Sequence, residues 1–576
     1  MPPTPAYSDA FNADLLARLP LAARSILDVG CHTGALGAAY RRRNPRARLI
    51  GIEADAAAAA LARTRLDAVH VADVEAEPLP AGVPDGLDAI VYGDVLEHLR
   101  DPFAVMARQM AALAREGVVL ACVPNVEHWS FASRLLHGIW DYDEQGLFDR
   151  THLRWFSRRS MTTGLERLGL TVCDVTPRIF DAATARPFLK AIGPALTAMG
   201  VDPADYAARA LPLQYIWRAR RTAPARILVA ATRLRPVGGV SGVRIDYPQE
   251  AIATDPAVRV HTGPVAGFPA MTEAGAEEEA RIAVLHRPLL TGAEGLAVLR
   301  RLLQGGYVVV TEFDDLPEHF PAMRRADQYA FTGVHAAQTT TSHLAGILRA
   351  KNPEVGVFPN AIREVPEVAN FAEADRLTLF FGALNREADW APYLPVLNEV
   401  AARAGGRLRF RVVHDRALFE ALTTPHKEFT PTCDHATYLR LLGQSEICFM
   451  PLADTAFNRA KSDLKFIEAG ACRVAALASP VVYAASLRDG ETGALFRDAE
   501  ELRRRLSDLV AYPDLARRLG DAARAYVIAE RMLADQVAPR LAWYRDLWAR
   551  REDLTRALLA RVPELAAVAT EPSVPG

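Results

Sequence analysis

The sequence predicts an α/β protein in which parallel β-sheets are covered by helices on both faces. Short apolar runs of strand length alternate with helix-forming segments along most of the chain, a pattern typical of such sheets. The chain has 576 residues, which is too long for one hydrophobic core, so we expect about two to three domains. A glycine-containing turn at residues 28–34 follows the first strand, at the place where open parallel sheets bind ligands.

The first part of the chain alternates between strands and helices. We expect strands at residues 25–29, 47–52, 69–72, 87–92 and 118–123, and helices at residues 35–43, 56–65 and 102–115. A segment rich in Trp, His, Asp and Arg at residues 125–156 interrupts this alternation. It is followed by a helix at 158–168, a strand at 171–175, a proline-broken helical stretch at 186–210 and a last strand at 213–218.

A second alternation begins after a basic linker at residues 218–224. Its expected strands are residues 226–230, 282–285, 307–311 and 337–340, then, after a pause near 359–362, residues 377–381, 408–413, 447–450 and 474–478. Helix-forming sequence dominates residues 500–550. The pattern therefore predicts domains at residues 1–222, 223–365 and 366–550, with a partly disordered C-terminal tail at 551–576.

The composition excludes several classes of protein. A formal net charge of −2 argues against a nucleic-acid partner, because such proteins usually carry a basic excess. The six cysteines lack the spacing of zinc ligands. The first residues do not form a secretory signal, and no apolar run is long enough to span a membrane. We therefore expect a cytoplasmic protein, compatible with peripheral association with the inner face of a membrane.

Acidic residues stand at the carboxyl ends of four successive predicted strands. They are Asp28, Glu53, Asp73 and Asp94. A carboxylate at the end of the second strand, here Glu53, can bind both hydroxyls of a ribose, and Asp73 can accept a hydrogen bond from an adenine amino group. Gly30 and Gly34 let the backbone turn tightly beside a ligand. Cys31 and His32 follow Gly30, so this turn is not the Gly-x-Gly-x-x-Gly pattern of pyrophosphate-binding turns. A nucleoside joined to an amino acid therefore fits better than a pyrophosphate.

With residues 94–99, this ordered set resembles the motifs of class I S-adenosylmethionine (SAM)-dependent methyltransferases over residues 1–221. The resemblance implies a Rossmann-like, seven-stranded sheet with an antiparallel last strand, for which residues 213–218 are suitable. It implies SAM as methyl donor and these cofactor-binding residues: Asp28, Gly30, Gly34, Glu53, Asp73 and Asp94. Two alternatives are a non-catalytic SAM-binding domain and an NAD-binding Rossmann domain, against which the missing third glycine argues.

Residues 148–156 resemble a segment of methyltransferases that act on glycans and small molecules. A hydroxyl acceptor needs a base, and His152 could supply it near neutral pH. The alternative is that His152 only hydrogen-bonds within its loop or shapes the acceptor pocket. His98 and His128 are weaker candidates. Methyl transfer from a sulfonium also gains from alignment alone, so a base is not strictly required.

A second candidate site lies at residues 457–472, where a basic loop leads into an apolar helix. Lys461, together with Arg459 or Lys465, could neutralise a diphosphate with help from the helix N-terminus. Glu468 lies further along this helix and could bind a ribose. The alternative is a solvated charge pair beside a core helix, which is the usual meaning of an isolated Lys/Glu pair.

The wider pattern resembles the retaining GT-B glycosyltransferases related to family 4 over residues 225–550. In that family a Glu before small residues binds the donor ribose, as Glu468 would here. The resemblance implies a two-lobed GT-B fold of two further Rossmann-like domains, a nucleotide-diphosphate sugar as donor, and no metal. It implies these donor-side residues: Gly239, Gly382, Asn458, Arg459, Lys461, Lys465 and Glu468.

Two features of this second region leave alternatives open. Asp314 and Asp315 form either a metal-binding pair or acceptor-side groups that cap a helix or hydrogen-bond the acceptor, and the GT-B resemblance favours the second. Ala460 stands eight residues before Glu468, where many family 4 enzymes carry another Glu. Donor-sugar binding is therefore altered, or the role moves to Asp454, Asn458 or Arg459, and the stereochemical outcome stays open.

The two resemblances lead to one leading hypothesis. The chain is expected to be a bifunctional enzyme that transfers a sugar from a nucleotide-sugar to a glycan or lipid-linked glycan, and a methyl group from SAM to a sugar hydroxyl. Such reactions belong to the synthesis of bacterial surface polysaccharides or glycoconjugates. Covalent fusion would keep the product of one site close to the other.

Overall fold

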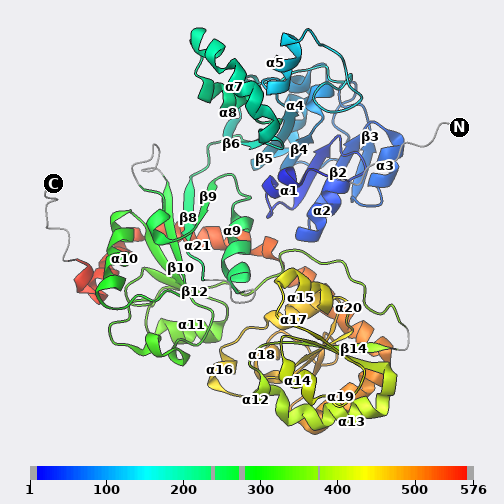
Figure 1. The fold of residues 1–576 in the computed structure, drawn as a ribbon, viewed down its shortest axis with the longest axis vertical. Helices are drawn as coiled ribbons and strands as arrows, with labels where there is room; N and C mark the ends of the chain where they lie inside the picture. Colours follow the sequence, from blue (N-terminus) through cyan, green and yellow to red (C-terminus); the bar gives the residue numbers. More distant parts are fainter. Residues whose placement is uncertain (1–9, 235–239, 271–278, 374–375, 567–576) are drawn as a thin grey trace. The chain divides into compact units, whose positions relative to one another are not determined.

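The computed structural model describes residues 10–234, 240–270, 279–373 and 376–566. The chain divides into two compact units (Figure 1). The first comprises residues up to 225 together with residues 253–258, and the second comprises residues 226–252 and those from 259 onwards.

Seven strands form the sheet of the first unit, in the order β3-β2-β1-β4-β5-β7-β6. They are β1 (Ser25–Val29), β2 (Arg48–Glu53), β3 (Ala68–Val71), β4 (Leu87–Gly93), β5 (Leu113–Pro124), β6 (Thr171–Arg178) and β7 (Gln214–Arg220). β1 pairs in parallel with β2 and β4, whereas β7 runs antiparallel to β5 and β6. This confirms the predicted seven-stranded sheet with an antiparallel last strand.

Helices cover both faces of this first sheet. They are α1 (Ala13–Arg18), α2 (Ala35–Arg43), α3 (Ala56–Ala62), α4 (Pro102–Gln109), α5 (Trp129–Leu136), α6 (Arg158–Arg167), α7 (Ala182–Ala198) and α8 (Pro203–Ala210). Alternate residues of β1 enter different cores: Leu27 packs in a cluster with Met106 of α4, and Ile26 in a cluster with Tyr40 of α2. The period-two alternation of a strand therefore joins both helical layers to the sheet.

The helix expected at residues 102–115 is shorter than predicted. α4 ends at Gln109, a 3₁₀ turn spans Met110–Ala112, and β5 begins at Leu113. Leu113 pairs with Leu87 of β4. Strand pairing therefore overrides the helix-forming composition of the last residues, as tertiary contacts often do.

The second unit contains two six-stranded sheets, in the orders β13-β12-β11-β10-β8-β9 and β16-β15-β14-β17-β18-β19. The strands of the first are β8 (Ile227–Ala231), β9 (Val258–Thr262), β10 (Ala280–His286), β11 (Val308–Glu312), β12 (Ala336–Thr339) and β13 (Val355–Val357). Those of the second are β14 (Leu377–Gly382), β15 (Leu408–Val413), β16 (Lys427–Thr430), β17 (Ile447–Met450), β18 (Ala475–Ala478) and β19 (Ala494–Leu495). Neighbours such as β10–β11 and β14–β15 are parallel, which confirms the predicted pair of Rossmann-like sheets.

Four strands of these two sheets have no counterpart in the sequence-based prediction. They are β9, β13, β16 and β19, and all four are edge strands. An edge strand pairs on one side only and is often short or polar, as in the Lys-Glu-Phe-Thr sequence of β16. Such segments lack the apolar run by which the central strands are recognised.

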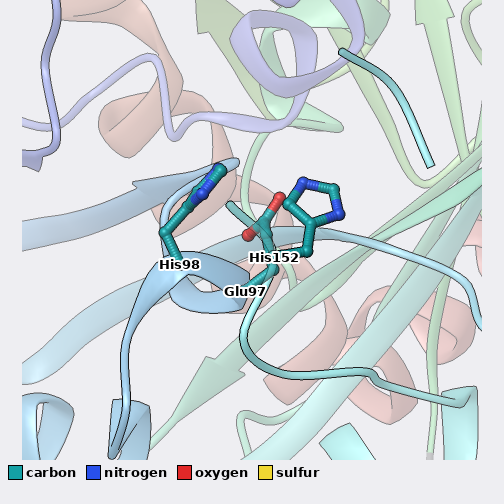
Figure 2. Close-up of side chains that lie close together, drawn as sticks. All are labelled: Glu97, His98 and His152. Carbon is teal, nitrogen blue, oxygen red and sulfur yellow. The ribbon is translucent and has the colours of Figure 1, made fainter. Parts of the chain in front are cut away.

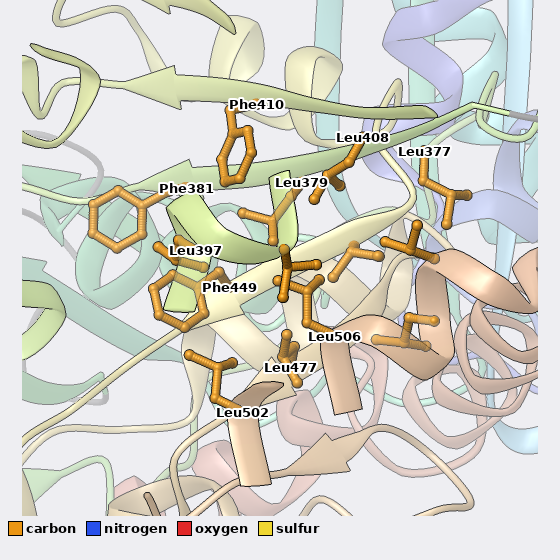
Figure 3. Close-up of a cluster of buried hydrophobic side chains, with 14 of the residues drawn as sticks. Leu377, Leu379, Phe381, Leu397, Leu408, Phe410, Phe449, Leu477, Leu502 and Leu506 are labelled. Carbon is orange, nitrogen blue, oxygen red and sulfur yellow. The ribbon is translucent and has the colours of Figure 1, made fainter. Parts of the chain in front are cut away.

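The core of the sheet that contains β14 shows why its central strands were predictable. Leu377, Leu379 and Phe381 alternate along β14 and enter one buried cluster, whereas Phe380 enters the cluster on the opposite face. Figure 3 shows members of the first cluster, in which the strand residues pack with Leu397, Leu502 and Leu506. Apolar residues on both faces produce the continuous hydrophobic run of a buried parallel strand.

The helices of the second unit surround these sheets. The longer ones are α9 (Tyr247–Ile252), α10 (Gly292–Gln304), α11 (Ser342–Arg349), α13 (Leu394–Ala404), α14 (Arg416–Ala421), α15 (His435–Leu442), α17 (Leu464–Ala471), α19 (Ala499–Ala511), α20 (Pro513–Glu530), α21 (Val537–Ala549) and α22 (Arg551–Arg561). Short helices lie at α12 (Glu387–Trp390), α16 (Ala456–Arg459) and α18 (Pro480–Tyr483). Among the described residues, no helix has both the length and the hydropathy needed to cross a membrane.

The chain after residue 536 returns to the sheet that contains β11. The Tyr544 hydroxyl in α21 donates to Gln338 Oε1 at 2.9 Å. Leu558 and Val562 of the α22 region are buried in a cluster with Val309 of β11. Residues 551–566 are thus ordered by apolar burial rather than forming a tail, which corrects that part of the prediction, and residues 567–576 lie outside the described residues.

A buried ion pair lies at the carboxyl end of β11. Arg244 Nε and Nη2 donate to the Glu312 carboxylate at 2.9 and 3.1 Å, and these side chains are 2% and 0% exposed. Arg244 Nη1 donates to Phe358 O and Asn360 Oδ1, both at 2.9 Å. Gln338 Nε2 donates to Glu312 Oε2 at 2.7 Å. The pair is therefore surrounded by hydrogen bonds that satisfy its charges.

Replacing Glu312 with Ala is expected to destabilise the second unit by about 3–5 kcal/mol, because Arg244 would remain buried without its counter-ion. Urea unfolding of the full chain measures the change. Asp553→Ala, which removes the exposed partner of Arg556 in α22, is the control and should leave the unfolding midpoint unchanged. Equal midpoints for Glu312→Ala and the wild type would contradict the prediction.

Candidate active sites

The turn after β1 is shaped by two glycines in the left-handed region. Gly30 and Gly34 both have φ of 73°, and a Cβ on Gly30 would lie 2.8 Å from Val95 Cγ2. Gly30 N donates to Ile52 O at 2.8 Å, which holds the turn against β2. Both positions therefore require glycine, and the backbone stays open beside the carboxyl end of the sheet.

Glu53 and Asp73 occupy the next two strand ends. Glu53 Oε2 accepts from His32 N at 2.8 Å and Oε1 accepts from Asp55 N at 2.9 Å, so its carboxylate is held at the glycine turn. Asp73 follows β3, is exposed, and its Oδ1 accepts from Glu75 N at 2.9 Å. The fold thus brings the predicted acids to one edge of the sheet, as parallel strands require.

Two further acids, Asp28 and Asp94, lie at this edge; Asp28 is 8% exposed, whereas Asp94 is an exposed residue. Burial, followed by the charge of Glu53, raises the pKa of Asp28 to about 7. Desolvation of the Asp94 carboxyl by its surroundings raises its pKa as well, and this residue accepts a hydrogen bond from the Gln214 amide and has a φ of 56°. Buried acids and strained backbone of this kind concentrate at functional sites.

His152 lies in a cluster with Glu97 and His98. The cluster has one ligand-type atom from each residue, all within 4.8 Å of one another, and Figure 2 shows the Glu97 carboxylate between the two imidazole rings. Leu153 N and Arg154 N donate to Glu97 O at 2.8 and 2.9 Å, which fixes the histidine loop on the turn after β4. Burial and the charge of His98 lower the pKa of His152. The base role of His152 remains a prediction.

Glu97 is a site residue that sequence reasoning missed. It sits in the 3₁₀ turn Leu96–His98 and is 2% exposed, and burial, followed by the charge of Asp94, raises its pKa well above the usual range. Glu97 lies within the 94–99 motif identified from the sequence, so this motif could have indicated it as a site residue. His128 is not in this cluster: its Nδ1 contacts Ser130 Oγ at 2.8 Å, and burial lowers its pKa to about 4.

Aromatic side chains adjoin this cluster. The His152 ring lies 5.7 Å from the Trp155 ring, which lies 5.2 Å from Phe131 and 6.4 Å from Trp140. Phe148 packs 4.5 Å from Phe131. Trp140 is 45% exposed, so an apolar and partly open surface borders the histidines.

The second unit contains a cavity of about 350 Å³ at the carboxyl ends of its strands. Its lining includes five of the predicted residues, which are Asp314, Gly382, Lys461, Lys465 and Glu468. Arg459 lies apart from it and pairs with Asp454, both more than half exposed. Gly239 lies outside the described residues.

Five basic side chains line this cavity: Arg244, Arg287, Arg386, Lys461 and Lys465. Lys461 Nζ lies 2.7 and 2.9 Å from the Asp315 oxygens, and Arg287 Nε donates to Asp314 Oδ1 at 2.6 Å. The Lys465 ammonium donates to Gly382 O, and burial lowers the pKa of Lys465. Only two acids, Asp314 and Glu468, are among the described lining residues, against these five basic side chains. The cavity therefore suits an anionic ligand.

Two further residues of this site were missed by sequence reasoning. Arg386 donates to Asn458 Oδ1 at 2.7 Å and to Asp389 at 3.0 Å, so Asn458 acts behind Arg386 rather than in the cavity wall. His435 Nε2 lies 2.7 Å from Glu468 Oε1. Although burial opposes it, the hydrogen bond and charge of Glu468 raise the pKa of His435. Both contacts join distant segments, so no local signal indicates them.

Family comparisons match both units. Residues 6–175 match a family model described as a methyltransferase domain, and residues 395–541 match one described as glycosyl transferase-like. Over 149 residues the chain is 30% identical to an uncharacterized methyltransferase of Mycobacterium tuberculosis strain H37Rv, covering 25% of this chain and 72% of the relative.

Solved structures show similarity at low identity. Staphylococcus aureus TarM matches with 9% identity and a TM-score of 0.37 over 46% of this chain and 55% of its own. The chain therefore spans about half the length of TarM. Anabaena HepE in complex with UDP and glucose matches with 13% identity and a TM-score of 0.40, over 55% of this chain and 99% of its own.

The buried Asp28 predicts a pH dependence of the first unit. Because its pKa rises from 3.8 to about 7 on folding, neutral Asp28 favours the folded state at low pH, and this contribution is lost as pH rises through about 7. Asp28→Asn is expected to flatten this decline and to stabilise the ligand-free unit above about pH 8 by on the order of 4 kcal/mol.

Urea unfolding between about pH 5 and about pH 8 measures this effect. Asp85→Asn, in an exposed loop, is the matched control and should follow the wild-type pH profile. A wild-type profile that Asp28→Asn leaves unaltered would show that Asp28 is ionised throughout.

Proposed function

We propose that both units of this chain transfer groups to one glycan. The chain belongs to the methyltransferase family through its first unit, and it carries a glycosyl transferase-like domain in its second. The first would methylate a sugar hydroxyl from SAM, and the second would add a sugar from a nucleotide-diphosphate donor. The observation that carries this proposal is that one chain holds two different sites: strand-end carboxylates gathered at one sheet edge in the first unit, and a cavity lined mainly by basic residues in the second.

The first site is suited to SAM because the strand-end acids can each bind one part of the SAM molecule. Glu53 would bind the ribose hydroxyls, Asp73 the adenine amino group, and Asp28 and Asp94 would compensate the positive charge of the ligand. The Gly30–Gly34 turn leaves room for the amino acid portion. These assignments rest on the carboxylates gathered at one sheet edge.

Methyl transfer at this site needs an aligned acceptor. As the new O–C bond forms, the C–S bond breaks and its electron pair returns to sulfur, while the hydroxyl proton would pass to the neutral imidazole of His152. The aromatic rings of Trp155 and Trp140 beside His152 would pack against the face of a sugar. Alignment of oxygen, carbon and sulfur supplies much of the acceleration.

The second site is suited to a nucleotide-diphosphate sugar. Lys461, Lys465 and Arg386 would neutralise the diphosphate as it leaves, and Glu468 would bind the ribose. On the acceptor side, Asp314 and Asp315 already pair with Arg287 and Lys461. Ala460 has a methyl side chain that is fully buried. This position therefore supplies no carboxylate for recognition of the donor sugar.

The acceptor that best accounts for both sites is a glycan or lipid-linked glycan of a bacterial surface polysaccharide or glycoconjugate. A sugar added by the second unit would offer a hydroxyl to the first. Fusion raises the local concentration of that product at the methylating site.

Glu53→Ala is expected to weaken SAM binding by at least about tenfold, because two charge-assisted hydrogen bonds to ribose are lost. Calorimetry measures the affinity, and mass spectrometry of glycans from complemented cells should show loss of one methylene increment. Glu116→Ala, an exposed acid of the same unit, is the control. Unchanged methylation in Glu53→Ala would mean that the first unit does not catalyse this transfer.

Glu468→Ala is expected to remove a whole sugar residue from the same glycans, because the donor ribose loses its carboxylate partner. Glu552→Ala, exposed on α22, is the matched control. Glycans that keep every sugar in Glu468→Ala cells would contradict the proposed donor site.

A further inference from the structure

The cluster of Glu97, His98 and His152 is built from two segments that are distant in sequence. Glu97 and His98 belong to the 3₁₀ turn after β4, and His152 belongs to the loop before α6. One ligand-type atom from each lies within 4.8 Å of the others. In Figure 2 all three side chains converge on the same space.

Glu97 Oε2 has no hydrogen-bond partner among the residues that the structure describes. Within the described residues this atom is buried and accepts no hydrogen bond, and the whole residue is 2% exposed. Leaving a buried carboxylate oxygen unsatisfied is costly, and nearly all such groups in native proteins have a partner. A cation held against the two imidazoles would satisfy this oxygen.

The two imidazoles are held in place by surrounding groups. His98 Nδ1 lies 3.0 Å from Thr151 Oγ1, and Asp149 Oδ1 accepts from that hydroxyl at 2.6 Å. His152 Nδ1 lies 3.3 Å from Leu147 O. Contacts of this kind orient the rings of metal-binding histidines and set their tautomer.

We propose that Glu97, His98 and His152 bind one divalent transition-metal cation. Two imidazole nitrogens and one carboxylate oxygen form a donor set that Mn²⁺, Fe²⁺, Co²⁺ and Zn²⁺ accept, with coordination positions left open. Asp94 and Asp149, whose charges act on this cluster, add negative potential that favours a cation. The sequence predicted no metal because its Cys/His spacings show none, and only folding joins these residues.

The role of this cation rests on the proposed methyl transfer, whereas its binding does not. An acceptor hydroxyl at an open position would lose its proton to solvent more readily, because a bound cation stabilises the alkoxide. The oxygen would then attack the methyl carbon, and the C–S electron pair would return to sulfur. His152 is then a ligand and not the base expected from the sequence.

Titration of the EDTA-treated, desalted full-length protein with Mn²⁺, followed by electron paramagnetic resonance, tests the proposal. The wild type should bind one Mn²⁺ that Glu97→Gln and His152→Ala bind at least about tenfold more weakly. His137→Ala is the control and should bind like the wild type, because its Nδ1 contacts Ser133 O in an exposed position outside the cluster. SAM calorimetry on each variant shows that the unit remains folded.

Absence of Mn²⁺ binding by the wild type, or wild-type affinity in Glu97→Gln, would overturn the metal site. Methyl transfer that proceeds at the same rate in EDTA would overturn the catalytic role of the cation. Failure of the proposed methylation itself is distinguished by Glu53→Ala, which acts on SAM and leaves Mn²⁺ binding intact.

Discussion

The parallel direction of the strands is the constraint on which both sites depend. In each sheet the central strands are buried on both faces, so polar groups are placed mainly at strand ends. Because neighbours run in the same direction, their carboxyl ends meet at one edge. Glu53 at the end of β2 and Asp94 after β4 share one such edge, and Glu312 and Gly382 end strands of the other two sheets.

The two sites treat buried charge in different ways. In the first unit, Asp28 and Glu97 are buried acids whose pKa values rise, an arrangement that stabilises a cationic ligand such as a sulfonium or a metal ion. In the second unit the basic groups are paired, as in Arg244–Glu312 and Lys461–Asp315. A diphosphate in the cavity would add an anionic partner for Lys461 and Arg386, which line it, so each charge pattern complements the proposed ligand.

The sequence predicts the central strands well because each is an apolar run bounded by turns. It does not predict β9, β13, β16 and β19, since edge strands bury less surface and show weaker patterns. It also extends α4 into β5 and treats residues 551–566 as a tail, although Leu558 is fully buried. These misses occur where pairing or packing with a distant segment decides the local conformation.

The sequence by itself determined the seven-stranded sheet and the order of the strand-end acids, because strand, turn and acid are adjacent along the chain. Only the tertiary structure placed His152 against Glu97 and His98, paired His435 with Glu468, and set Arg386 in front of Asn458. Each of these contacts joins segments far apart in sequence. Their distances depend on how helices and loops pack on the sheets, and no local pattern of residues encodes that packing.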